Sequence, residues 1–162
     1  MKKLLGTVAL VGMLMAPSAV SAQTTIGGVL GYHDDFDALG IGAYAAFALP
    51  QLHENISINP SFMYYFPDGF DAWEVNGDLV YAFPVSADSP ITPFALAGIN
   101  IMRVSFDAGV FGSASSTDVG LNLGGGVTFP MEGFTPFAGA KFEIQDGTGF
   151  LIFGGAGFAV GG

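Results

Sequence analysis

Residues 118–129 read DVGLNLGGGVTF, residues 134–145 read FTPFAGAKFEIQ, and apolar residues dominate every second position of both stretches. In a β-strand successive side chains point to opposite faces, so a period of two predicts a strand with one apolar face. The turn-forming run Met131-Glu132-Gly133 separates the two stretches. Together they predict an antiparallel hairpin with one apolar face and one face of small or polar residues.

The same alternation recurs along the chain and predicts eight strands, at about 24–33, 40–49, 54–65, 71–83, 91–104, 116–129, 134–145 and 148–160. No helical stretch interrupts them, and the connections are rich in Asp, Gly and Pro. Every second connection has the same proline-bounded form, after Leu49, Phe83 and Phe129. This repeat predicts an up-and-down meander. We call the end with these connections the proline rim and the opposite end the aspartate rim.

The polar faces of neighbouring strands also match. A turn near 131–132 would pair Lys141 with Asn122 and Glu143 with Gly120. A turn near Ala87 would pair Glu74 with Asn100 and Asp78 with Leu96. A register error of one residue would place a whole polar face against an apolar one, so this agreement supports the strand assignment.

Residues 1–22 have the features of a cleavable signal peptide. Lys2 and Lys3 precede an apolar run from Leu4 to Ala16, which is too short to span a bilayer, and small residues end at Ala22. An uncleaved N-terminal anchor is the alternative. We therefore predict a signal peptide at 1–22 and one barrel domain at 23–162, exported across the inner membrane.

The charge balance excludes several classes of function. The chain has 4 basic and 14 acidic residues and no Cys, yet its mean hydropathy is positive. This acidic balance argues against nucleic-acid binding, which needs a basic surface. Absent cysteine excludes disulfides and thiolate metal sites. After cleavage at 22, only Arg103 and Lys141 would remain basic.

The apolar face is predicted to point outward. An eight-stranded barrel has an interior just wide enough for side chains. Filling it with the large residues of the apolar face, such as Trp73, Tyr81, Phe83, Phe129 and Phe142, would overfill it. We therefore expect small and polar residues inside and an apolar belt in lipid. Aromatic residues near the strand ends would form the two girdles of a transmembrane barrel, comprising Tyr64, Tyr65, Phe66, Phe70 and Trp73 at one rim and Phe47, Phe83, Phe94, Phe129 and Phe134 at the other.

The resulting fold class is all-β: an eight-stranded antiparallel up-and-down transmembrane β-barrel with both termini periplasmic. The stretches TPFALAG (92–98), LNLGGGVTF (121–129) and TPFAGAKF (135–142) resemble strands of the small outer-membrane barrel family of the OmpA-transmembrane-domain and OmpX type. The resemblance implies a monomer in the bacterial outer membrane. It implies as partners outer-membrane lipids and lipopolysaccharide, with periplasmic chaperones and the barrel-assembly machinery during biogenesis. Such barrels usually end on Phe or Trp, whereas this chain ends two glycines after Val160, with Phe158 nearby.

Polar residues on the inward face form the first candidate site, a lumen network of Glu74, Asp78, Asn100, Asp118, Asn122, Lys141 and Glu143. Unpaired buried charge is costly, so we expect the acids to be bridged by Lys141, hydrated or protonated. Two interpretations remain open: a polar plug that stabilises the barrel, which we favour, and an ion path.

Charged residues at the aspartate rim form the second candidate site, consisting of Asp34, Asp35, Asp37, Asp68, Asp71, Arg103, Asp107 and Asp146. Longer loops of such barrels face outward, and the longest loop predicted here, 105–116, lies on this rim. Divalent cations bridging these carboxylates to lipopolysaccharide phosphates are one interpretation, and solvated loop charge is the other. The spacing matches no calcium-binding loop, and we predict no metal or cofactor site.

Both histidines are predicted to be solvated rim residues, His33 on the aspartate rim and His53 on the proline rim. Some eight-stranded barrels acylate or deacylate lipid A with His and Ser, but no Ser lies in the loop beside His33. The favoured function is therefore non-enzymatic, a structural envelope or surface-contact role. The alternative is a narrow channel for ions or for small hydrophobic solutes, as in OmpW-like barrels. A lipid A-modifying enzyme and a secreted soluble β-protein are minor alternatives.

Overall fold

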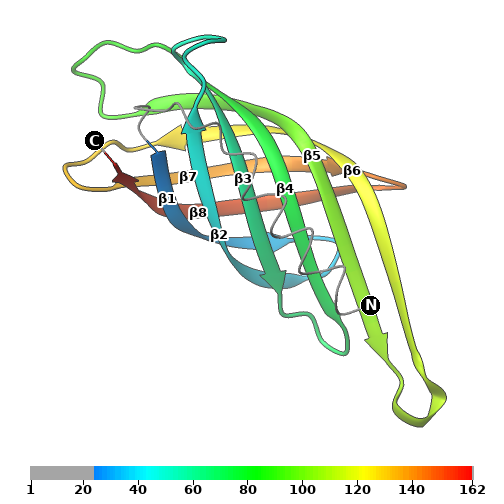
Figure 1. Ribbon diagram of the computed structural model, residues 1–162. Helices are drawn as coiled ribbons and strands as arrows, with labels where there is room; N and C mark the ends of the chain where they lie inside the picture. The colour runs from blue at the N-terminus through cyan, green and yellow to red at the C-terminus, as the bar shows by residue number, and fades with distance from the viewer. Residues whose placement is uncertain (1–23, 162) are drawn as a thin grey trace.

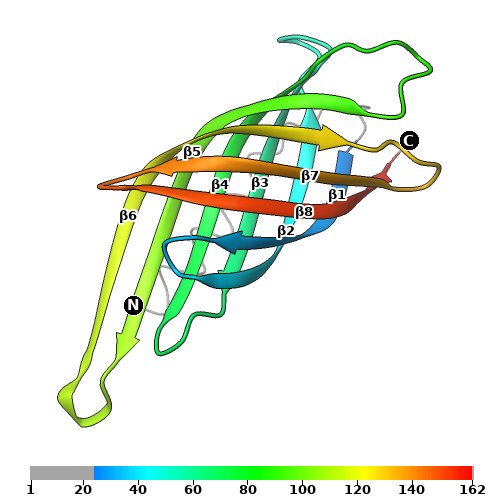
Figure 2. The same ribbon diagram turned by 180° about the vertical axis from the view of Figure 1, so that it is seen from behind.

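A computed structural model describes residues 24–161, which form a closed antiparallel barrel with strand order β1 to β8 (Figures 1 and 2). The strands are β1 (Thr24–His33), β2 (Ala38–Ala48), β3 (Ile56–Tyr65), β4 (Asp71–Ala82), β5 (Thr92–Asp107), β6 (Ser113–Thr128), β7 (Thr135–Ile144) and β8 (Thr148–Val160). The eight-stranded up-and-down prediction is confirmed. The predicted signal peptide and its cleavage point lie outside the described residues.

The barrel closes through a continuous ladder between its first and last strands. β1 pairs with β8 from Thr24 opposite Val160 to His33 opposite Leu151. Closure leaves no unpaired sheet edge, which is what an apolar surrounding requires. The two described ends of the chain therefore lie side by side at the proline rim (Figure 1). No helix among residues 24–161 is long and apolar enough to cross a membrane.

The predicted hairpin registers are each wrong by two residues. Lys141 pairs with Gly124 and Glu143 with Asn122, and in the other hairpin Glu74 pairs with Met102 and Asp78 with Gly98. A shift of two keeps each side chain on its predicted face. In the first hairpin the turn is centred later than expected because Gly133 supplies the positive φ of 90° that the chain reversal needs.

The hairpin β5–β6 is longer than predicted, so the long loop at 105–116 is wrong. The ladder continues to Asp107 opposite Ser113, and the connection is a short 3-10 turn, η1 (Gly109–Phe111), flanked by Gly112. The run 113–117 consists of Ser, Ala and Thr, so it has no large apolar side chain on either face, and both of its faces are exposed. The hairpin therefore projects beyond the other strands (Figure 2).

The lengths of the connections also contradict the expectation that the longer loops lie at the aspartate rim. Those at the aspartate rim, 34–37, 66–70, 108–112 and 145–147, have three to five residues. Those at the proline rim, 49–55, 83–91 and 129–134, have six to nine. The extension of the aspartate rim therefore comes from paired strand rather than from loop.

Apolar side chains cover the outside of the barrel, as the sequence predicted. Their exposed fractions range from 49% to 68% in the set Ile26, Leu30, Leu39, Ile41, Leu79, Ile99, Leu121, Leu123, Phe142 and Ile152. The interior differs from the expectation of small and polar residues because Tyr65, Phe70 and Phe94, expected in the girdles, pack or point inward.

Glycine makes room for these inward rings. A Cβ added at Gly126 would lie 2.8 Å from Cζ of Phe94, and one at Gly139 would lie 2.7 Å from Cζ of Phe153. Both distances are closer than packed carbon atoms tolerate, so a larger residue at either glycine would displace a ring. The run Gly124-Gly125-Gly126 is thus a packing surface for an aromatic ring and for the neighbouring strand.

Candidate functional site

The predicted lumen network exists and is centred on Lys141 of β7. Its Nζ lies 2.9 Å from Oε1 of Glu143 and 3.6 Å from Oε1 of Glu74, and it donates to Oδ1 of Asn76 at 2.7 Å. These four side chains are almost completely buried. Two acids and one amide thus share a single ammonium group, which supplies the pairing that buried charge needs.

Amide side chains extend the network across the barrel. Nδ2 of Asn122 donates to Asn76 at 2.8 Å and to Asp78 at 2.7 Å. Asn100 donates to Asn122 at 2.5 Å, and Gln145 donates to Asn100 at 2.7 Å. The connected groups come from β4, β5, β6 and the residue that follows β7, so the network ties together strands that are not neighbours.

Asn76 and Gln145 are functional members that the sequence analysis left out. Asn76 lies between Glu74 and Asp78 on the inward face of β4, and Gln145 follows Glu143 by two positions. The period-two pattern therefore carried the signal for both.

His33 was predicted to be a solvated rim histidine, and this is wrong: its side chain is only 2% exposed. It is the last residue of β1 on the inward face, and its Nε2 lies 3.1 Å from Oε2 of Glu143. Phe36 stacks on the ring at a centroid distance of 4.5 Å, and Tyr65 packs edge-on at 5.5 Å. The network thus includes β1 as a fifth strand.

Asp118 departs from its predicted role. It points inward but is half-exposed, and among residues 24–161 it makes no side-chain hydrogen bond to the network. Instead it lines a small cavity at the aspartate rim together with His33 and Glu143. It lies four residues closer to the rim than Asn122 on β6.

Several acids of the aspartate rim bind within their own turns or to the strand beside them. Asp37 accepts from the Tyr32 hydroxyl at 2.6 Å, Asp71 from the Tyr64 hydroxyl, Asp107 from a backbone amide at 2.9 Å, and Asp34 from the Phe150 amide at 2.6 Å. Asp35, Asp68 and Asp146 are exposed. These bonds fix the turns, and the predicted contact with cations or lipopolysaccharide stays a prediction.

Arg103 lies on the outer face of β5 near this rim. Its guanidinium donates to Oγ of Ser115 at 2.9 Å and to Oγ1 of Thr117 at 3.2 Å, both on β6. No rim aspartate among residues 24–161 lies within ion-pair distance of it. The rim therefore keeps an unbalanced negative charge.

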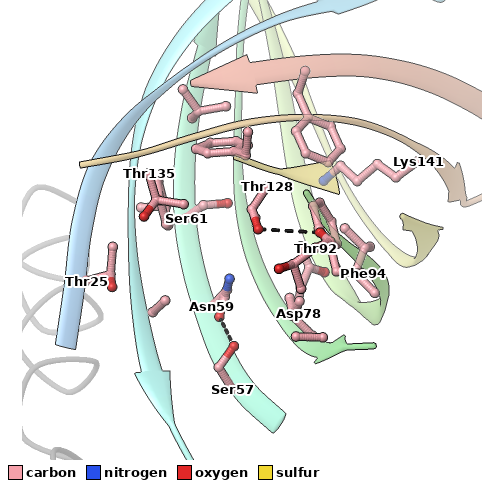
Figure 3. Close-up of a pocket in the computed structure, with 18 of the residues that line it drawn as sticks. Thr25, Ser57, Asn59, Ser61, Asp78, Thr92, Phe94, Thr128, Thr135 and Lys141 are labelled. Carbon is pink, nitrogen blue, oxygen red and sulfur yellow. Dashed lines mark hydrogen bonds between the residues drawn. The ribbon is translucent and has the colours of Figure 1, made fainter. Parts of the chain in front are cut away.

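The network separates two cavities in the lumen. The larger, of about 270 Å³, opens toward the proline rim and is lined by rings such as Phe94 and Phe153 and by hydroxyls such as Ser57 and Thr92 (Figure 3). Lys141 reaches its inner end from β7 (Figure 3). The smaller, of about 110 Å³, lies beside His33 at the aspartate rim. The two cavities share no lining residue, so the polar network interrupts the lumen.

No protein-family model and no curated protein matches the sequence. Solved structures do match its fold. The N-terminal β-barrel domain of Pseudomonas aeruginosa OprF has a TM-score of 0.71 at 15% identity, covering 86% of this chain and 98% of that one. This is the fold of the small outer-membrane barrels.

Two further structures extend this comparison. Neisserial surface protein A has a TM-score of 0.68 at 14% identity, with 89% of this chain and 100% of that one covered. The outer membrane enzyme PagL has a TM-score of 0.51 at 14% identity, with 84% and 99% covered. The small-barrel fold therefore accommodates proteins of different function, and the role of this chain must be argued from its own site.

Proposed function

We propose that the protein is a monomeric, non-enzymatic barrel of the bacterial outer membrane that serves a structural or surface-contact role in the envelope. The observation that carries this proposal is the buried network around Lys141, which bridges β1, β4, β5, β6 and β7 and divides the lumen. A closed lumen favours a structural role over a role as a pore. The partners would be outer-membrane lipids and lipopolysaccharide, with periplasmic chaperones and the assembly machinery acting during biogenesis.

Conductance in planar bilayers tests the closed lumen. The refolded barrel is expected to give no steady current, because Lys141, Glu74 and Glu143 fill the constriction with mutually paired groups. Folded protein is verified by its shift on unboiled gels, and a sixteen-stranded porin in the same bilayer controls for sensitivity. A steady open-channel conductance would contradict the structural role and favour the ion path.

Fractionation tests the location. The apolar outer surface needs lipid around it, so the protein should be found with outer membranes and should migrate differently before and after boiling. A form free in the periplasm, with no heat-dependent shift, would favour the soluble β-protein instead.

The absence of a nucleophile beside His33 supports a non-enzymatic role. The ring contacts Glu143, Phe36 and Tyr65, and no Ser or Thr hydroxyl among residues 24–161 bonds to it. Acyl transfer by a histidine needs such a hydroxyl within hydrogen-bond reach. Incubation with lipid A followed by mass spectrometry is expected to show unchanged acyl chains, and any gain or loss of an acyl group would contradict the proposal.

Binding of a small hydrophobic solute is the second candidate, because the cavity at the proline rim is favourable for one. Tyr44, Phe94, Phe137 and Phe153 supply aromatic walls, and the volume of about 270 Å³ suits a molecule of modest size. Quenching of a bound fluorescent apolar probe tests this candidate: Phe94→Ala should weaken binding, whereas Leu79→Ala on the outer face should not. Equal effects would point to non-specific binding in the detergent or lipid.

A further inference from the structure

A buried histidine nitrogen at the aspartate rim has no hydrogen-bond partner among the described residues. Nδ1 of His33 is inaccessible to solvent and unpaired, and it lies 3.9 Å from Oδ1 of Asp34. One ring nitrogen of His33 and one carboxylate oxygen each from Asp34 and Asp35 lie within 4.8 Å of one another. An unpaired buried ring nitrogen is costly unless something binds to it.

The other side of the ring faces a carboxylate. Nε2 faces Oε2 of Glu143 at 3.1 Å, and a neutral imidazole that donates from Nε2 carries its lone pair on Nδ1. A carboxylate that orients a histidine in this way is the usual outer partner of a metal-binding imidazole. Stacking on Phe36 and edge contact with Tyr65 fix the ring plane, so the lone pair has one direction.

We propose that His33, Asp34 and Asp35 bind a zinc-like divalent cation at the aspartate rim. The ligands would be Nδ1 of His33 and one oxygen from each aspartate, with water in the open position. One nitrogen and two carboxylate oxygens suit Zn²⁺, whereas Ca²⁺ and Mg²⁺ prefer oxygen ligands alone.

The geometry allows the ligands to close on an ion. Tetrahedral zinc ligands lie roughly 3.4 Å apart. Oδ1 of Asp34 is already 3.9 Å from Nδ1 of His33, and the exposed side chain of Asp35 can rotate toward both while the ring of His33 stays fixed. The same Oδ1 of Asp34 accepts from the Phe150 amide, which leaves it a second lone pair for a cation. The adjoining cavity of about 110 Å³ holds room for water and includes Asp118 and Asp35 in its lining.

The charges around the cluster also favour a cation. Asp34, Asp35 and Asp118 gather here, and within residues 24–161 neither Lys141 nor Arg103 lies within 4 Å of any of them. Among the described residues, the aspartates of the cluster make one ion pair, the long one between Asp34 and His33.

Calorimetric titration of the untagged, refolded barrel with ZnCl₂ tests the proposal. We expect one Zn²⁺ per barrel, roughly tenfold weaker binding in Asp35→Asn, and unchanged binding in Asp68→Asn, which removes an exposed acid of the same rim outside the cluster. His33→Gln should abolish binding, and His53→Gln on the other rim should not. No saturable binding, or equal weakening by Asp35→Asn and Asp68→Asn, would overturn the site.

Imidazole ¹⁵N spectra supply a readout that does not depend on how the variants fold. In the wild-type barrel Zn²⁺ should shift the resonance of Nδ1 of His33 and leave the protonated Nε2 beside Glu143. CaCl₂ and MgCl₂ at the same concentration should leave both unchanged. A spectrum that does not respond to Zn²⁺, or responds equally to Ca²⁺, would show a histidine with a purely structural role and would overturn the proposal.

Discussion

The two ends of the lumen are built differently although the same eight strands enclose both. At the proline rim, rings and hydroxyls surround an open cavity of about 270 Å³. From the middle to the aspartate rim, Met63, Tyr65, Met102 and Leu151 join the charged network in filling the interior, and the remaining space is about 110 Å³. The side chains at each depth of the barrel, rather than its width, therefore determine whether the lumen is open.

The difference teaches where the stability of the barrel lies. In the filled half, each buried group has packed or charged neighbours, so its removal leaves an uncompensated charge or a void. In the open half, a side chain already borders empty space. Substitutions at matched depth in the two halves should therefore differ in cost, and Trp73, the only Trp of the chain, reports unfolding of each variant from the outer surface.

Lys141→Met should have the largest effect. It leaves Glu74 and Glu143 buried without their shared cation, which is expected to lower the free energy of unfolding by about 4 kcal/mol. Urea unfolding in lipid vesicles, followed by Trp73 fluorescence, measures the loss. Adding Glu74→Gln to the variant removes one unpaired charge and should recover part of the lost free energy of unfolding. An unchanged unfolding midpoint would refute a buried ion network.

Met102→Ala is expected to cost about 3 kcal/mol because the side chain is only 3% exposed and belongs to the apolar cluster of the filled half, where it borders only the smaller cavity of about 110 Å³. The same urea experiment measures it. The control is Ile101→Ala, the neighbouring outward position on β5, where the side chain is exposed on the outer surface and the loss should be clearly smaller. Equal losses would mean that the interior is not tightly packed at this level.

Gly139→Ala should destabilise by about 2 kcal/mol, since the added methyl group would lie 2.7 Å from both the Gly125 carbonyl oxygen and a Phe153 ring carbon. Gly77→Ala is the matched control: its added carbon would meet nothing closer than 3.9 Å. Samples of both variants are heated to increasing temperatures, and the fractions of the folded and unfolded gel bands give the two midpoints of thermal unfolding. Equal midpoints would show that the ring of Phe153 shifts at little energetic cost to accommodate the added methyl group.

Sequence periodicity predicted the strands, the closed barrel and which face of each strand points inward. It placed Glu74, Asn100, Asn122 and Lys141 in one network because they share that inward face. It could not pair them, since Lys141 and Asn76 meet across the barrel only after closure. A pattern of faces carries no information on contacts through the lumen.

The wrong predictions for His33, the β5–β6 hairpin and Phe94 also have physical causes. His33 has the inward parity of β1, but its burial depends on Phe36 and Tyr65 covering it from other segments. The outer end of the β5–β6 ladder was missed because Ser113 and the polar residues after it form strand without an apolar face. Phe94 was expected in a girdle because its distance from the rim is right, although its parity points inward.

Val80→Ala should have the smallest effect, below about 1 kcal/mol. Val80 points inward like Glu74 on the same strand but lines the open cavity, so the lost methyl groups enlarge existing space rather than create a new void. The same urea experiment compares it with Met102→Ala. A cost of Val80→Ala equal to that of Met102→Ala would mean that the cavity is filled in the folded protein. The contrast between the two halves would then reflect an occupant of the open end rather than the packing of the chain itself.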